Sequence, residues 1–199
     1  MLDGSTHVSI GSTLTGVARP ALIDRNGVLD AGLAIADEQG LESLTMQAVA
    51  ERLGVTPMAL YRHVAGKNDL LDGLVERLLT NFPSPPAEFF WVDRLVNVAD
   101  AIRESARRHP AVFPLLLHRP ATSSAARAMR DGIFLALQEA GVGPEKIART
   151  ERLISTAVLG FAVSEVAGRF KRLPRHELDA DFDLLKDRLR MFIDDEARC

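Results

Sequence analysis

Cysteine is almost absent from the sequence, since its single cysteine, Cys199, is the last of the 199 residues. A lone thiol cannot close an internal disulfide, and it lies far along the chain from other residues that bind metals. We therefore expect neither a disulfide nor a metal site. This cysteine usage is typical of a protein from a reducing cytoplasm.

Long hydrophobic runs are lacking as well. No apolar stretch approaches the roughly 20 residues that a membrane helix needs, and the mean hydropathy is only +0.03. The first ten residues, MLDGSTHVSI, have no basic region followed by an apolar block, so they do not resemble a secretory leader. We expect no membrane partner and a cytoplasmic location.

The common catalytic signatures are missing too. The sequence contains no Gly-x-Ser-x-Gly, no His-Glu-x-x-His and no phosphate-binding P-loop, so we expect no enzymatic activity and no cofactor. Positive charge is not in excess, because 24 basic and 27 acidic residues give a net charge of −3. Any interaction with nucleic acid must therefore depend on a local arrangement of residues.

The sequence does contain helical periodicity. Apolar residues make up 47% and charged residues 26% of the chain, as in an ordinary folded protein, and no run alternates with a period of two. The predicted fold class is all-α. The apolar spacing predicts helices over residues 21–39, 45–53, 57–64, 67–80, 92–106, 124–140, 145–173 and 181–194.

Two segments fall outside this helical pattern. Residues 1–19 are small and polar with no period, which predicts a mobile N-terminal arm. Residues 81–87, NFPSPPA, contain three prolines and mark the main boundary between the two halves of the chain.

The second and third predicted helices form a helix-turn-helix pattern. Gly54 permits a tight turn, and Val55 can fill the crossing between the two helices. Thr56 and Pro57 then start the next helix as N-cap and first helical residue. Leu60 faces inward, so the opposite face of that helix is free to enter a major groove of DNA.

The outward face of this helix has side chains that suit DNA. Arg62 can donate to guanine or to a phosphate, and Met58 and Ala59 can contact thymine methyl groups. Three further side chains, each of which donates a single hydrogen bond, suit phosphate oxygens: Tyr61, His63 and Lys67. Taken singly, a core-packed tyrosine and a solvated histidine are equally compatible with the pattern, but the neighbouring cations favour DNA.

Residues Leu44–Leu71, LTMQAVAERLGVTPMALYRHVAGKNDLL, resemble the DNA-binding segment of the tetracycline-repressor (TetR) family. The ordered matches are Leu44-Thr45, Ala50, Leu53-Gly54-Val55, Leu60-Tyr61-x-His63-Val64, Lys67 and Leu70-Leu71. The resemblance implies an all-helical homodimer that represses transcription from a double-stranded DNA operator. It also implies release of that operator when a small apolar or amphipathic effector binds.

The resemblance carries roles over by position. It implies a DNA-binding domain over residues 20–66, a linking helix over 67–80, and a ligand-binding and dimerisation domain over 81–199. The residues that it places on DNA are Thr45, Gln47, Thr56, Pro57, Met58, Ala59, Tyr61, Arg62, His63 and Lys67.

Two features depart from the family pattern. Residues 57–59 offer few side-chain donors to base edges, so sequence preference would depend on Arg62, Gln47, apolar contacts and DNA shape. Residues 1–80 contain six basic and ten acidic residues, so attraction to phosphates would depend on local clustering of Arg52, Arg62 and Lys67. The alternative interpretation is a helical ligand-binding or adaptor protein with a degenerate DNA-binding head.

The C-terminal half contains most of the aromatic residues, which either fill a helical core or line a ligand cavity. The candidate cavity residues are Phe90, Asn97, His109, Phe113, His118, Phe134, Ser155 and Phe161. Small and apolar residues of the last two predicted helices are candidates for a dimer contact, with packing inside one chain as the alternative. They are Ile154, Ala157, Val158, Phe161, Leu185 and Leu189.

Overall fold

The computed structural model describes residues 23–82, 88–119 and 123–198, and these segments are helical with no strand among them. The all-α prediction is confirmed. The predicted arm over residues 1–19 and most of the proline-rich boundary over 81–87 lie outside the described residues.

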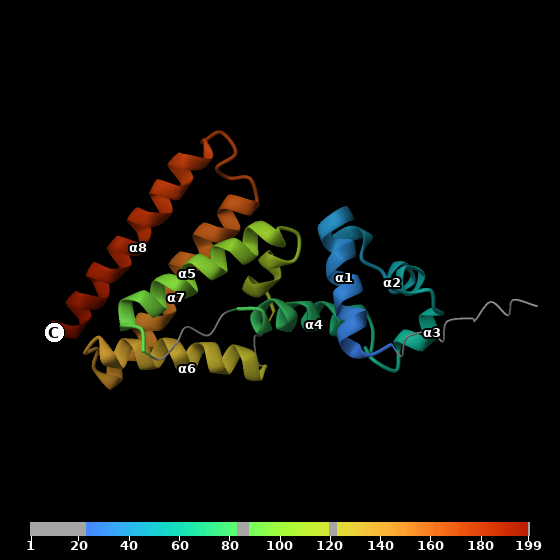
Figure 1. Ribbon diagram of the computed structural model, residues 1–199, viewed down its shortest axis with the longest axis horizontal. Coiled ribbons are helices and arrows are strands. Elements are labelled where there is room, and N and C mark those ends of the chain that lie inside the picture. Colours follow the sequence, from blue (N-terminus) through green and yellow to red (C-terminus); the bar gives the residue numbers. More distant parts are fainter. Residues whose placement is uncertain (1–22, 83–87, 120–122, 199) are drawn as a thin grey trace, which may run out of the picture.

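The head of the molecule, residues 23–66, is built from α1 (Arg25–Gln39), the 3₁₀ helix η1 (Leu41–Ser43), α2 (Met46–Leu53) and α3 (Pro57–Leu60). Figure 1 shows these helices gathered at one end of the molecule. The Asp24 carboxylate accepts from the Gly27 N–H at 2.7 Å and caps α1. The Thr45 hydroxyl accepts from the Ala48 N–H at 3.0 Å and caps α2.

The turn between α2 and α3 and the length of α3 are set by local geometry. Gly54 adopts φ +68°, a left-handed conformation that glycine tolerates best. Helix α3 is shorter than the sequence predicts, because Tyr61–His63 form a turn after Leu60. The N–H groups of His63 and Val64 both donate to the Leu60 carbonyl, at 2.8 and 3.0 Å, and this closes the helix.

Helix α4 (Lys67–Thr80) connects the head to the rest of the chain, as Figure 1 shows. Its buried face includes Leu70, Leu74 and Leu78, which belong to the same apolar core as Val28 of α1. That core continues without interruption to Phe113, which is fully buried. The head and the remaining helices therefore share one core and move against each other only by repacking it.

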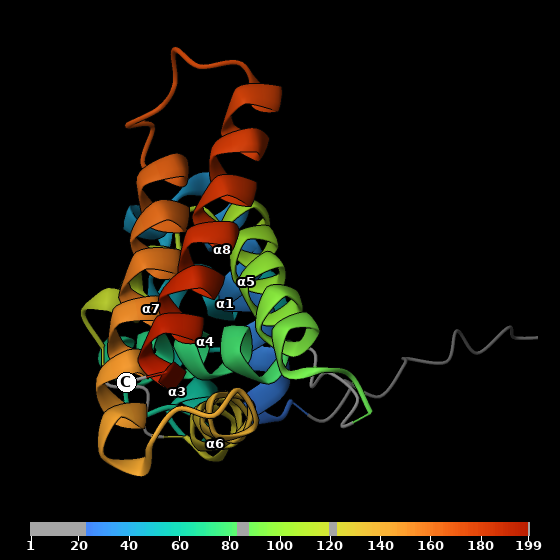
Figure 2. The same ribbon diagram turned by 90° about the vertical axis from the view of Figure 1, so that its left-hand side faces the viewer.

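The body of the molecule, residues 88–198, contains α5 (Trp91–Arg108), the 3₁₀ helix η2 (Phe113–Leu117), α6 (Ser124–Glu139), α7 (Pro144–Val166) and α8 (Arg175–Arg198). Figure 2 shows the axes of α5, α7 and α8 roughly aligned, with α7 and α8 antiparallel and α6 seen end-on beneath them. Helix α7 ends before the predicted limit of 173, because Gly168 turns the chain at φ +77°. Helix α8 begins earlier than the predicted 181.

A buried ion network joins α5, α7 and α8. The Arg103 Nε lies 2.7 Å from Glu165 Oε2, and the Arg107 Nη2 lies 2.7 Å from Glu165 Oε1. Both guanidinium groups also contact Asp179 of α8, at 3.0 and 2.7 Å. The Arg103 guanidinium further stands 4.6 Å from the centre of the Phe182 ring. The network fixes the end of the body where the chain passes from α7 to α8.

We expect Glu165→Ala to lower the free energy of unfolding by about 3 kcal/mol, since the buried Arg103 and the half-buried Arg107 lose the less exposed of their two shared partners. Chemical denaturation at fixed protein concentration measures this loss. Glu104→Ala is the matched control, because its pair with Arg108 is exposed, and its cost is expected to stay below about 0.5 kcal/mol. Equal losses for the two variants would contradict a structural role for the network.

Candidate DNA interface and effector cavity

The segment from Thr56 to His63 presents a continuous outward surface. Leu60 is fully buried beneath it, whereas Met58 and Tyr61 are 75% and 51% exposed. Arg62 is exposed in the turn that follows α3. The buried Leu60 therefore fixes the short helix α3 against the core. The outward residues project from α3 and from the turn that follows it.

The other predicted DNA contacts lie around this surface. Thr45 and Gln47 are exposed at the start of α2, where the Gln47 amide donates to Glu51 Oε1 at 2.7 Å. Lys67 is exposed as the first residue of α4. Thr56 is exposed, whereas the half-buried members are Pro57, Ala59 and His63. Seven of the ten residues lie at the N-terminal ends of α2, α3 and α4, where free backbone N–H groups favour anions, and Tyr61, Arg62 and His63 lie in the turn after α3.

The turn after α3 is held by an ion pair between Arg25 and Asp69, which we call the clamp. The Arg25 guanidinium bonds both Asp69 oxygens at 3.1 and 2.7 Å, and it also donates to the His63 carbonyl at 2.8 Å. Asp69 in turn accepts from the Ala65 N–H at 2.7 Å. The hydrogen bond from Arg25 holds the pKa of Asp69 below its usual value. The clamp thus ties the recognition turn to the first turns of both α1 and α4.

Ion pairs within the head and α4 engage three of the five lysine and arginine side chains of residues 23–82. Arg52 pairs with Glu38 at 2.8 Å, Arg77 with Asp30 at 2.8 Å, and the clamp occupies Asp69. Within residues 23–82, the cations that make no ion pair are Arg62 and Lys67. Arg52 is engaged with Glu38, so the cationic cluster that the sequence suggested consists of the other two, and both lie on the candidate DNA surface.

Polar contacts also join the body to the head and α4. The His109 Nδ1, at the end of α5, lies 2.8 Å from Asp37 Oδ2 near the end of α1. Arg119 donates to Asp72 at 2.5 Å and to the Asn68 carbonyl at 3.2 Å, both on α4. His109, a candidate cavity residue, is therefore placed at the junction of head and body.

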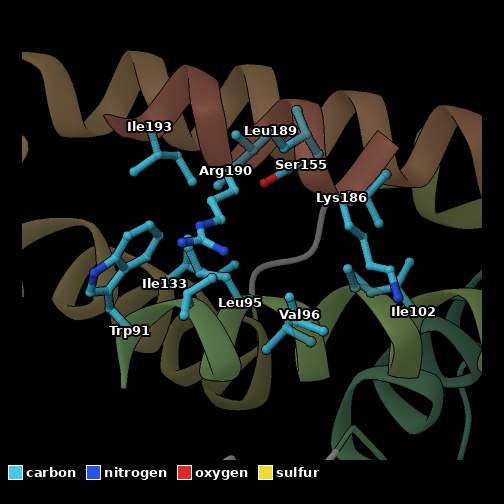
Figure 3. A pocket seen from close by; sticks show the side chains of 15 residues that line it. Trp91, Leu95, Val96, Ile102, Ile133, Ser155, Lys186, Leu189, Arg190 and Ile193 are labelled. Carbon is cyan, nitrogen blue, oxygen red and sulfur yellow. The ribbon is translucent and has the colours of Figure 1, made fainter. Parts of the chain in front are cut away.

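An apolar cavity of about 60 Å³ lies between α5 and α8, with walls from α6 and α7. Figure 3 shows side chains from both α5 and α8 entering it. The lining residues are Trp91, Val92, Leu95, Val96, Val98, Ala99, Ile102, Ile133, Ile154, Ser155, Val158, Lys186, Leu189, Arg190 and Ile193. Ligand pockets usually hold about 300–1,000 Å³, so a ligand must widen this one as it enters.

A second hollow of about 140 Å³ shares Ile102, Ile133 and Ser155 with the first. It extends to Leu79 and Phe82, at the C-terminal end of α4 and just beyond it. The two hollows are therefore neighbours that these three side chains separate, and the second one reaches the end of the linking helix.

Of the predicted cavity residues, Ser155 lines both hollows, and its hydroxyl donates to Glu151 at 2.7 Å. Phe90 and Asn97 are exposed on α5 or just before it, and His118 is exposed after η2. The others pack among apolar neighbours: Phe113 is fully buried, Phe134 packs against the cluster around Ile133, and Phe161 stacks with Phe170 and Phe182. Sequence reasoning missed Trp91 and Arg190, whose positions in the helical pattern indicated no cavity.

The predicted dimer residues mostly contact their own chain. Ile154 and Val158 are buried, and the half-buried members are Ala157, Phe161, Leu185 and Leu189. The exposed large apolar side chains of α7 and α8 are Leu153, Leu184 and Met191. Leu184 and Met191 are seven residues apart, which puts them on one helix face, and this spacing was a readable signal in the sequence.

In the described segments, no three His, Cys, Asp or Glu side chains gather in a way that would hold a metal ion. The helices described there include none with the length and apolar character needed to cross a bilayer.

Two family models match the chain. Residues 28–74 match the model of bacterial regulatory proteins of the tetR family, and residues 95–189 match the tetracyclin repressor-like C-terminal domain. The first match covers the helix-turn-helix and the start of α4. The second covers most of α5 through to the middle of α8.

Curated relatives agree with these matches. The chain is 33% identical over 153 residues to the tetracycline repressor protein class A from transposon 1721 of Escherichia coli, covering 72% of this chain and 67% of that one. It is 30% identical over 151 residues to the HTH-type transcriptional repressor DrrR1 of Streptomyces coeruleorubidus, covering 74% of this chain. The latter match spans only 55% of the relative's length.

Solved structures share the fold. Apo ActR from Streptomyces coelicolor superposes with a TM-score of 0.77 at 21% identity, covering 89% of this chain and 97% of that one. BioQ with its double-stranded DNA operator superposes with a TM-score of 0.68 at 27% identity, covering 84% of this chain and 98% of that one.

We expect Asp69→Asn to lower the free energy of unfolding by about 1–2 kcal/mol, because a partly exposed charged hydrogen-bond pair is lost. The pKa of Asp69 is lowered by folding from its ordinary 3.8. Its contribution is therefore complete above that pH and is lost as the pH falls through the lowered folded-state value.

The measurement is urea denaturation of both proteins from pH 7 down to pH 3. The gap in stability between wild type and Asp69→Asn should stay constant above about pH 5 and narrow below about pH 4. Asp30→Asn serves as the control, since its pair with Arg77 leaves the aspartate 53% exposed. A gap of the same size at pH 3 and pH 7 would rule out the clamp as an ionised pair.

Proposed function

Because the chain belongs to the TetR family of bacterial regulatory proteins, we propose that it is a ligand-responsive transcriptional repressor. It binds an inverted-repeat operator as a homodimer, and a small apolar or amphipathic effector releases it. It acts on DNA in the cytoplasm and catalyses no reaction. The observation that carries the proposal is the outward recognition surface, on which the unpaired cations of residues 23–82 both lie.

The residues of the recognition surface suit two kinds of contact with DNA, to base edges and to phosphates. Arg62 has the geometry to bond the O6 and N7 atoms of a guanine, and Met58 offers an apolar contact to a thymine methyl group. Lys67, at the N-terminus of α4, and Thr45, at that of α2, suit phosphates. Since few side chains donate to base edges, DNA shape contributes a large share of the sequence preference.

The linking helix supports the response to an effector. Its N-terminal turn carries Asp69 of the clamp, and near its C-terminal end Leu79 and Phe82 line the second hollow. An effector that widens the cavity displaces α4, and α4 then moves the recognition turn. A 100-fold loss of operator affinity needs about 2.7 kcal/mol of coupling, and operator must weaken effector binding by the same factor.

A dimer places two recognition surfaces in successive major grooves, about 34–36 Å apart. We assign the contact to the outer faces of α7 and α8, because Leu153, Leu184 and Met191 are exposed there. Packing these faces against a second copy buries them in a four-helix contact.

The adaptor alternative took its support from the acidic excess of residues 1–80. The ion pairs of Asp30, Glu38 and Asp69 use basic residues of the same segment and leave that excess unchanged, but the unpaired cations Arg62 and Lys67 both lie on the recognition surface, where positive charge favours DNA. The repressor is therefore the function that we retain.

We expect Arg62→Ala to reduce sequence preference, because a contact to a base edge is lost, and Lys67→Ala to weaken binding to all DNA sequences. Fluorescence anisotropy on DNA from upstream of its own gene, with scrambled DNA for comparison, measures both effects. Because one phosphate contact is lost, the slope of log affinity against log salt concentration should be smaller by about one unit in Lys67→Ala than in the wild type. Arg172→Ala, which removes an exposed charge between α7 and α8, is the control. Unchanged operator selectivity in Arg62→Ala would refute its role.

Leu184→Arg should convert the dimer to a monomer, because an unpaired charge would be buried in the contact. Analytical ultracentrifugation detects the change, and operator affinity should fall by at least about tenfold with it. Leu135→Arg on α6 is a matched control, since the two leucines are 54% and 52% exposed. A Leu184→Arg protein that remains dimeric would exclude this face from the contact.

A further inference from the structure

The cavity between α5 and α8 has charge of one sign. Among its fifteen lining residues the charged ones are Lys186 and Arg190, and no aspartate or glutamate lines it. Apart from Ser155, the remaining walls are apolar. A molecule that enters the cavity therefore meets hydrocarbon walls and two cations.

The two cations differ in their partners. The Lys186 ammonium lies 2.7 Å from Asp100 and 3.0 Å from Asp183, so its charge is neutralised by the protein. Arg190 makes no hydrogen bond or ion pair within the described residues, although Asp187 and Asp194 lie one turn away on either side of α8.

The side chain of Arg190 is directed toward the cavity. Figure 3 shows it extending from α8 toward α5, into the space that Trp91 and Leu95 line. Arg190 is exposed to solvent at the mouth of the cavity, so its guanidinium donors are available to the charged head group of a ligand whose tail enters the apolar space.

A guanidinium matches a carboxylate with two parallel N–H donors. We propose that the effector is an amphipathic carboxylic acid whose carboxylate binds Arg190 and whose apolar tail occupies the cavity. This inference rests on the proposed function and names the chemical class of its ligand.

The shape of the cavity suits an unbranched tail. The space beside Arg190 is narrow, at about 60 Å³, and the second hollow lies behind Ile102, Ile133 and Ser155, whose side chains must move aside to open a route between the two. A flexible chain follows such a route more readily than a fused ring system. The far end of the tail then reaches Leu79 and Phe82, so that acid binding acts directly on the end of α4.

The test uses the single tryptophan of the chain, Trp91, whose fluorescence reports the occupancy of the cavity that it lines. The probes are decanoate, decan-1-ol and decylamine, which share a tail and differ in their head group. We expect decanoate to bind at least about tenfold more tightly than decan-1-ol, because only the carboxylate forms a charged hydrogen-bond pair with Arg190. Decylamine should bind most weakly, because its ammonium is repelled.

Arg190→Gln should reduce the affinity for decanoate to that for decan-1-ol and leave the affinity for decan-1-ol unchanged. Arg188→Gln is the matched control, since Arg188 is exposed on the same helix and does not line the cavity. It should keep the preference for decanoate.

Three results would overturn the inference: equal affinities of wild type for decanoate and decan-1-ol, an unchanged decanoate affinity in Arg190→Gln, or no binding of any probe. Operator binding is measured in parallel, without probe. A protein that binds no operator contradicts the proposed function. The fluorescence titration followed through Trp91 tests the binding of the carboxylic acid and does not involve DNA, so the two proposals can fail separately.

Discussion

The orientation of the recognition surface depends on the clamp between Arg25 and Asp69. Helix α3 has only four residues, and so short a helix cannot fix its own C-terminal turn by backbone hydrogen bonds alone. The clamp supplies what is missing, since Arg25 bonds the His63 carbonyl and Asp69 bonds the Ala65 N–H. Tyr61 and Arg62 are held outward because the backbone that follows them is tied to α1 and α4.

The clamp also makes α4 part of the DNA-reading apparatus. Helix α4 has 14 residues and is therefore about 21 Å long, with the clamp at one end and the second hollow at the other. The body contacts its first turns through Arg119 and contacts α1 through His109. Because head and body share one core, a displacement caused by a ligand in the body is transmitted to the recognition turn rather than absorbed between separate domains.

The order of the helices and the place of the helix-turn-helix were predictable because their signals are local. Thr45 caps α2, Gly54 makes the turn and Pro57 starts α3, each through neighbours within a few residues. The position of the turn after α3 was not predictable, since the bond from Arg25 to His63 joins residues 38 positions apart. The place of His109 depends on Asp37, 72 positions away. Contacts between residues so far apart in the sequence leave no signal in the periodicity of apolar residues.

The cavity was harder still to derive from sequence. Trp91 and Arg190 occupy ordinary positions at the start of one helix and within another, and only the packing of α8 over α5 brings both to one space. An arginine on a charged helix is usually solvated. Arg190 is itself exposed, and what distinguishes it is its place at the mouth of an apolar cavity together with the absence of a partner within the described residues, both of which are tertiary properties.

The most direct test of the account is the dependence of operator affinity on the distance between its two half-sites. Fluorescence anisotropy would compare the natural inverted repeat with a version in which five base pairs are inserted at its centre. Two recognition surfaces fixed on one dimer must meet the same face of the duplex, with a repeat of about 10–10.5 base pairs. The account predicts that the insertion reduces affinity to that of a single half-site. An affinity unchanged by the insertion would contradict it.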